Sequence, residues 1–286
     1  MGEFVRIFEM AARDGLQNEG RLVPAAEKIR LIDMLSDCGF QNIEATSFVS
    51  PRWVPQMADA AGVMAGIRRA PDVVYAVLVP NLKGYEAARA ANADEIAVFA
   101  SASETFSRKN INCSVAESLE RFRPVLAAAS ADGTPVRGYV SCVTDCPYEG
   151  RVPPAVVAQL AATLLEMGCY EISLGDTIGQ GTPATISAML DAVLEEVPAG
   201  RLAGHYHDTG GRALDNILAS LEKGLRTFDA AVGGLGGCPF APGAKGNVDT
   251  LAVAAMLADK SYETGLHIER LGAAARFADS LREERP

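Results

Sequence analysis

Short apolar segments recur along the chain and alternate with longer amphipathic ones. Eight apolar runs bounded by Gly, Pro, Asn or Asp occupy residues 5–10, 42–48, 73–79, 95–100, 136–142, 171–174, 202–207 and 227–232. Such runs predict buried parallel strands, because a strand that is covered on both faces needs apolar side chains on both. Ala- and Leu-rich stretches of helical length lie between them, at residues 24–38, 53–69, 82–91, 115–130, 154–167, 183–196 and 213–223. Two more, at 248–259 and 266–282, follow the last strand.

Local signals agree with two of the helix starts. Thr182 precedes Pro183, which suits a first helical turn, and Ser114 and Glu117 have the spacing of a capping box. Eight strand–helix units predict an α/β fold, a (β/α)8 TIM barrel with extra helices after the last strand; a doubly wound open sheet is the alternative. No linker or shift in composition interrupts the pattern, so we interpret residues 1–286 as one catalytic domain.

Composition narrows the classes of function. The formal net charge of −10 disfavours a nucleic-acid partner. The longest uncharged stretches fall short of the roughly 18 to 20 apolar residues that a membrane span needs, and the N-terminus lacks the basic start of a secretory signal, so a cytoplasmic location is expected. The six cysteines are interpreted as reduced thiols, since their spacing fits no zinc ribbon.

Polar residues gather at the ends of the predicted strands, where TIM barrels carry their chemistry. His205 and His207 are two residues apart on one strand, so both imidazoles project to the same face and can bind one cation. Two hydrogen-bonded core histidines are the alternative. Asp14, at the end of the first strand, adds a carboxylate, and mixed nitrogen and oxygen ligation favours Mg²⁺ or Mn²⁺.

Two further residues have candidate chemistry. Arg13 places a permanent positive charge beside Asp14, which suits stabilisation of an enolate oxygen; a surface ion pair is the alternative. Cys238 lies in the glycine-rich segment 233–239, where a thiol can act as a proton donor or a nucleophile. A structural thiol is the alternative there.

At these positions the sequence resembles the 3-hydroxy-3-methylglutaryl-CoA lyase family. The matching motifs are RDGLQNE at 13–19, EATSFVSPRWVPQM at 44–57, KNINC at 109–113, CPYEG at 146–150, EISLGDT at 171–177 and GGLGGCPFAPGAKGN at 233–247. They extend from the first predicted strand to beyond the last, so the resemblance covers nearly the whole chain.

The resemblance implies a divalent-metal-dependent lyase that cleaves an acyl-CoA substrate to acetyl-CoA and acetoacetate by a retro-aldol reaction. Its implied metal ligands are Asp14, His205, His207 and Asn247. Its implied catalytic groups are Arg13 for the enolate, Cys238 as an acid/base on a loop that closes over substrate, and Glu44, Asp176 and Tyr139 as further active-site residues. A homodimer is a further expectation from the family.

Two departures from the family pattern concern the acyl group. The family commonly has a lysine where this chain has Gly20, and an acidic residue where it has Leu251. Other tertiary 3-hydroxyacyl-CoA esters, such as citramalyl-CoA or an isoprenoid-tailed glutaryl-CoA, are therefore alternative substrates. A related condensing synthase is disfavoured because no regulatory extension follows the last predicted helix. A non-catalytic binding barrel is disfavoured because Arg13 and the ligands are present.

Overall fold

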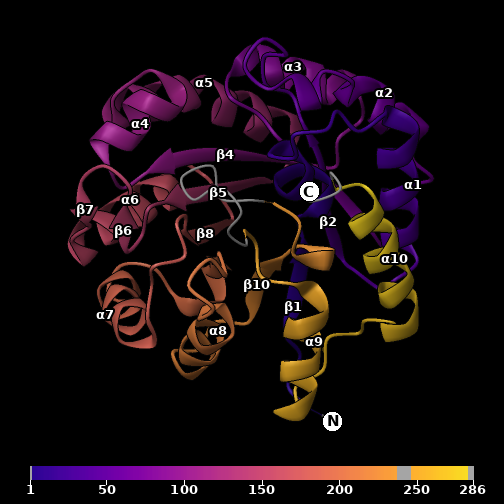
Figure 1. The fold of residues 1–286 in the computed structure, drawn as a ribbon. Helices are drawn as coiled ribbons and strands as arrows, with labels where there is room; N and C mark the ends of the chain where they lie inside the picture. The colour runs from indigo at the N-terminus through magenta and orange to yellow at the C-terminus, as the bar shows by residue number, and fades with distance from the viewer. Residues whose placement is uncertain (1, 237–245, 283–286) are drawn as a thin grey trace.

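Eight parallel strands close into a barrel in the computed structural model, which describes residues 2–236 and 246–282 (Figure 1). The barrel strands are β1 (Arg6–Glu9), β2 (Asn42–Ser47), β3 (Val74–Leu78), β4 (Glu95–Ser101), β5 (Val136–Ser141), β8 (Glu171–Asp176), β9 (Leu202–Tyr206) and β10 (Thr227–Ala230). β1 pairs with both β2 and β10, which closes the sheet and confirms the predicted barrel.

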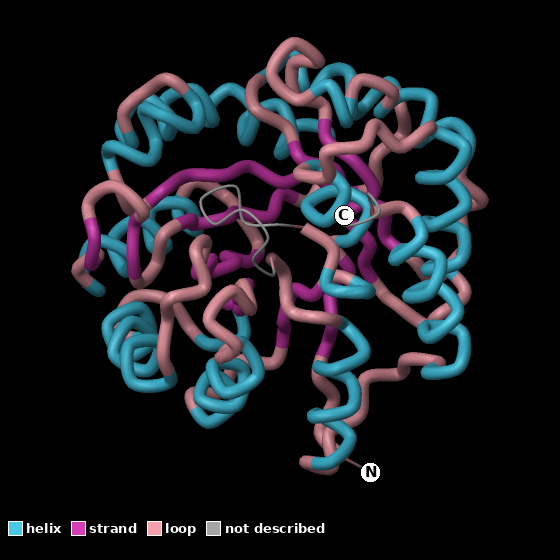
Figure 2. Tube along the Cα trace, viewed as in Figure 1, coloured by secondary structure: helices cyan, strands magenta, loops and turns pink. Residues whose placement is uncertain are grey.

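Helices form an outer layer around the strands (Figure 2). They are α1 (Ala25–Ser36), α2 (Ala60–Gly66), α3 (Leu82–Ala90), α4 (Glu104–Ile111), α5 (Val115–Asp132), α6 (Pro154–Glu166), α7 (Pro183–Leu194), α8 (Ala213–Glu222), α9 (Thr250–Asp259) and α10 (Ile268–Ser280). The predicted capping box of Ser114 and Glu117 is present at the start of α5. The last two helices confirm the extra helical segments expected after the final strand.

Three regions differ from the pattern-based prediction. The helix expected at residues 53–69 is shorter, because a 3-10 turn (Pro55–Met57) precedes α2 and Gln56 bonds to the backbone of residues 21 and 23 instead. Helix α4 was not expected, since its polar sequence lacks apolar periodicity. A two-stranded hairpin, β6 (Asp145–Cys146) and β7 (Gly150–Arg151), also projects from the β5–α6 connection.

The barrel interior holds both apolar and charged side chains. A small buried cluster of Phe8, Met10, Ala76, Leu78, Ala97 and Tyr139 lies apart from the main core. Buried charged side chains lie on several strands, such as Glu44 on β2, Arg137 on β5 and Asp229 on β10. Buried polar groups need hydrogen-bond partners. The hydrogen bonds of these side chains extend to the candidate active site described below.

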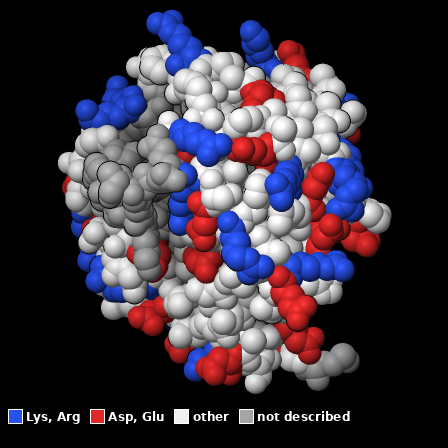
Figure 3. Space-filling model, turned by 45° about the vertical axis from the view of Figure 1, so that its right-hand side comes forward, with Lys and Arg blue, Asp and Glu red and all other residues white. Residues whose placement is uncertain are grey.

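The outer surface mixes charges of both signs. On the face that Figure 3 shows, Lys and Arg side chains lie beside Asp and Glu. Exposed ion pairs such as Arg68 with Asp37, 2.7 Å apart, each contribute little to stability because water screens them. Within the described residues, no helix is both long and apolar enough to cross a membrane.

Candidate active site at the carboxyl ends of the strands

A single π-helical turn (Ala11–Gly15) follows β1 and carries Arg13 and Asp14. The Gly15 amide donates to the Met10 carbonyl at 3.1 Å, the five-residue spacing that defines such a turn. Gly15 is required here, since a Cβ at this position would lie 2.7 Å from the Leu235 Cβ. The close approach brings the turn against the segment that follows β10.

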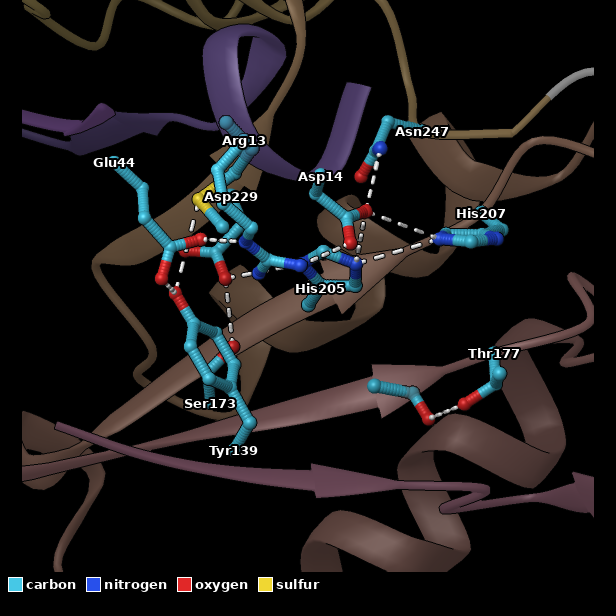
Figure 4. Close-up of polar contacts among 12 residues, drawn as sticks. Arg13, Asp14, Glu44, Tyr139, Ser173, Thr177, His205, His207, Asp229 and Asn247 are labelled. Atoms are coloured by element: carbon cyan, nitrogen blue, oxygen red, sulfur yellow. Dashed lines mark hydrogen bonds and ion pairs between the residues drawn. The ribbon is translucent and has the colours of Figure 1, made fainter. Parts of the chain in front are cut away.

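Asp14, His205 and His207 converge at the mouth of the barrel (Figure 4), and we call these three residues the cation-site cluster. The two histidine Nε2 atoms are 3.4 Å apart, and they lie 3.7 and 3.8 Å from the Asp14 Oδ2. Both histidines are buried. The structure therefore brings together the three ligands that the sequence alone had indicated.

Asn247 reaches the same carboxylate from the other side of the mouth. Its Nδ2 donates to the Asp14 Oδ2 at 2.8 Å and to the Leu235 carbonyl at 3.2 Å. A bridge between His207 and Asn247 aligns the returning segment with the end of β9. The ligand set implied by the resemblance is thus gathered in one place.

Arg13 connects Asp14 to a buried pair beneath it. Its guanidinium forms ion pairs with both Asp14 and Glu44, and Tyr139 donates its hydroxyl to the Glu44 Oε1 at 3.3 Å. Burial raises the pKa of Glu44, and the charge of Arg13 opposes that rise. Burial would also raise the pKa of Asp14, but Arg13 and His207 hold it well below its usual range. Asp14 is therefore a carboxylate.

Deeper in the barrel lies a second polar group, the Arg137 cluster, made of Arg6, Arg137, Glu171 and Asp229. Arg137 donates from Nε to Glu171 at 2.8 Å and from Nη2 to Asp229 at 2.8 Å. Arg6 also pairs with Glu171. The apolar pattern of the sequence does not mark these four residues as functional. The available signal was a charged residue inside a short apolar run, as in VRGYVS at 136–141.

Glu9 joins three segments around the site. Its fully buried carboxylate accepts from the Ala11 and Val232 amides, both at 2.9 Å, and from the Thr250 hydroxyl at 2.8 Å. Burial raises its pKa to about 7. The turn that carries Asp14 is thereby held to the two segments that flank residues 237–245.

The two other candidate catalytic residues are Asp176 and Cys238. Asp176, at the end of β8, accepts from the Gly181 amide at 2.8 Å and from Thr144 at 3.3 Å, and its backbone carbonyl accepts from the His207 amide at 3.4 Å. Burial raises its pKa. Cys238 lies outside the described residues.

The other five cysteines are free and buried. Burial raises the pKa of Cys38, Cys142 and Cys169 to about 12, so these thiols stay protonated at neutral pH. Buried, protonated thiols of this kind are poor nucleophiles.

The donor atoms of the cation-site cluster suit a divalent cation. One carboxylate oxygen and two imidazole nitrogens lie within 4.8 Å of one another. Mixed nitrogen and oxygen ligands favour Mg²⁺ or Mn²⁺, whereas thiolate ligands favour zinc.

Residues 4–278 match the sequence model of the family described as HMGL-like. The chain belongs to the HMGL-like family. A Danio rerio protein named 3-hydroxy-3-methylglutaryl-CoA lyase, cytoplasmic, is 58% identical to this HMGL-like chain over 274 residues, which cover 96% of this chain and 82% of that protein. A Pseudomonas aeruginosa protein named 3-hydroxy-3-isohexenylglutaryl-CoA/hydroxy-methylglutaryl-CoA lyase is 56% identical over 267 residues, with 93% and 89% covered.

Solved structures agree with the HMGL-like assignment. The crystal structure of the HMG-CoA lyase from Brucella melitensis is 68% identical, has a TM-score of 0.98, and covers 99% of this chain and 100% of that one. The carboxyl transferase domain of Rhizobium etli pyruvate carboxylase, at 18% identity and a TM-score of 0.75, shares the fold alone. The motif-based identification of a lyase of this family is confirmed.

Proposed function

We propose that this chain cleaves 3-hydroxy-3-methylglutaryl-CoA to acetyl-CoA and acetoacetate with the help of Mg²⁺ or Mn²⁺. The observation that carries the proposal is the contact of Arg13 with Asp14, because it places a fixed positive charge beside the cation-site cluster. An enolate oxygen that forms there is stabilised by a donor already in position.

The cation would be held by Asp14, His205, His207 and Asn247. When bound, it supplies a positive charge that lowers the pKa of the substrate hydroxyl. Asn247 contacts Asp14 through its amide nitrogen, and the opposite orientation of the amide would present its oxygen to the cation.

The protein groups would divide the retro-aldol cleavage among them. A general base accepts the 3-hydroxyl proton as the new carbonyl of acetoacetate forms. The C2–C3 bond breaks, and its electron pair moves to the thioester oxygen as an enolate. Arg13 would bind that oxygen, held in place by Glu44 and by the Tyr139 hydroxyl that reaches Glu44. Cys238 would return a proton to C2, giving acetyl-CoA. Asp176 would fix the loop after β8 beside the site.

A second acyl group is favoured by one relative. The Pseudomonas aeruginosa protein named for both isohexenylglutaryl-CoA and hydroxymethylglutaryl-CoA is 56% identical to this chain. Gly20 is exposed, and Leu251, in the first turn of α9, is half-buried against the apolar core where the family commonly has an acid. A longer or less polar tertiary 3-hydroxyacyl-CoA is therefore the second candidate.

The location and assembly stay predictions. The relatives are named cytoplasmic in Danio rerio and mitochondrial in Gallus gallus, so a cytoplasmic location is proposed on composition alone. A homodimer is proposed from the family.

The test is an assay of acetyl-CoA release from a panel of 3-hydroxyacyl-CoA esters, with and without EDTA. We expect the 3-methylglutaryl ester to have the highest kcat/KM. His207→Asn should abolish cleavage, whereas His267→Asn, which changes the exposed histidine before α10, should not. Cleavage of citramalyl-CoA alone would contradict the substrate, and full activity in EDTA would contradict the cation.

A further inference from the structure

Asp229 bonds to Arg137 in the Arg137 cluster and contacts His205 in the cation-site cluster (Figure 4 shows Asp229 with His205). Its side chain is buried within the barrel, on β10, next to His205 in the pairing of β10 with β9. The Oδ2 atom contacts the His205 Nδ1 at 3.1 Å and accepts from the Ser173 hydroxyl at 2.7 Å. One carboxylate therefore contacts both a predicted metal ligand and the deeper network.

The ionised state of Asp229 is secured by its other partners. Arg137 donates to both of its oxygens, at 3.1 and 2.8 Å. These two hydrogen bonds bring the permanent positive charge of the guanidinium directly against the Asp229 carboxylate. An ionised carboxylate only accepts hydrogen bonds, so the His205 Nδ1 must carry the proton that lies between them.

The opposite nitrogen of His205 faces the cation-site cluster. Its Nε2 is 3.4 Å from the His207 Nε2 and 3.7 Å from the Asp14 Oδ2. A neutral imidazole has one N–H, so a proton on Nδ1 leaves a lone pair on Nε2. The His205 ring therefore points the unprotonated Nε2, the atom that can bind a metal ion, toward Asp14 and His207.

We propose that Asp229 is a positioning residue that holds His205 in the Nδ1–H tautomer and so presents its Nε2 to the divalent cation. The inference rests on the proposed cation site. Arg137 and Ser173 would then contribute indirectly to the cation site, because they hold the Asp229 carboxylate that orients His205. Mutation of a group that orients a ligating histidine typically weakens metal affinity by about 10- to 100-fold, and we expect an effect of this size here.

Asp229→Asn is the direct test, because asparagine keeps the size of the side chain and removes the charge that selects the tautomer. Glu171→Gln is the matched control, since Glu171 also pairs with Arg137 but does not contact His205. Binding of Mn²⁺ to metal-stripped protein is followed by electron paramagnetic resonance. We expect Asp229→Asn to weaken binding by about 10- to 100-fold and Glu171→Gln to leave it unchanged. Equal weakening in both variants would overturn the inference, because the loss would then come from Arg137.

A second measurement needs no variant at Asp229. The chain has three histidines, so ¹⁵N spectra of the histidine side chains in Mg²⁺-loaded protein can be assigned with His207→Asn and His267→Asn. We expect a proton on the His205 Nδ1 in the wild type, and a proton on Nε2 would overturn the inference. The two proposals fail differently. Wild-type protein that binds no Mn²⁺ would overturn the cation site itself, whereas equal binding by wild type and Asp229→Asn would overturn only the role of Asp229.

Discussion

The barrel encloses two polar clusters built from the same kinds of side chain but arranged differently. In the Arg137 cluster, donors face acceptors: Arg137 is completely buried, and its guanidinium bonds to Glu171 and Asp229 at 2.8 Å each. In the cation-site cluster, the two histidine nitrogens face each other at 3.4 Å, and both stay more than 3.5 Å from the Asp14 oxygen nearest to them.

The Arg137 cluster satisfies its own charges and hydrogen bonds, whereas the cation-site cluster is arranged to bind a ligand. Buried charges persist where opposite charges and hydrogen bonds compensate them. Ligand atoms of several side chains that converge on one point favour a cation between them. Burial and charge therefore do not identify the site on their own. The relative geometry of donors and acceptors does.

Removal of the cation should have the largest effect and should act on one cluster only. We expect EDTA to reduce acetyl-CoA release below detection and Mg²⁺ or Mn²⁺ to restore it. The free energy of unfolding should fall only by the stabilisation that the ion confers, about 2.7 kcal/mol at a hundredfold excess over its Kd. Unfolding of the whole barrel in EDTA, followed by circular dichroism, would show that the two clusters are not independent.

Loss of the proposed acid should come next. Cys238→Ala is expected to lower kcat by about 10²- to 10⁴-fold, the usual contribution of a positioned proton donor, without changing Mn²⁺ affinity. Cys169→Ala removes a buried thiol away from the site and serves as the control. Unchanged turnover of Cys238→Ala in the acyl-CoA assay would make this cysteine structural.

Disruption of the Arg137 cluster should change stability directly. Arg137→Met leaves Asp229 and Glu171 without their shared cation, so the free energy of unfolding in urea should fall by about 3–5 kcal/mol. Asp14→Asn, in the cation-site cluster, should abolish activity and lower the stability of the metal-free protein by less, because Glu44 still pairs with Arg13. The reverse pattern would contradict the distinction between the clusters.

A smaller, pH-dependent effect is expected at Glu95, which interacts electrostatically with the Arg137 cluster. Burial raises its pKa to about 7, above the ordinary value of 4.5, although Arg137 and the Tyr170 hydroxyl oppose the rise. The folded protein therefore binds this proton more tightly than the unfolded chain, and stability should fall as pH rises from about 4.5 to about 7. Glu95→Gln lacks this dependence and should be more stable at pH 8 by up to roughly 3 kcal/mol. Parallel pH profiles of urea unfolding for variant and wild type would contradict the assignment.

The sequence predicted the strand–helix alternation and the convergence of Asp14, His205 and His207, because apolar periodicity and i, i+2 spacing are local properties. It did not predict Asp229 or Arg137. Their partners are set by register between strands: Asp229 pairs with His205 on β9, and Arg137 pairs with Glu171 on β8. Which residues lie side by side across two strands is a property of the closed sheet, and no single run of sequence contains it.

The pairing of β1 with β10 has a consequence for how the chain is made. The first cation ligand, Asp14, leaves the ribosome roughly 190 residues before the first histidine, which is about 10–40 s at ordinary rates of synthesis. The four proposed ligands meet only when the last strand joins the first and Glu9 bonds to both ends. An ion bound by them would therefore not guide the folding of the earlier strands. Metal-depleted protein should be a closed barrel that gains activity when Mg²⁺ or Mn²⁺ is added.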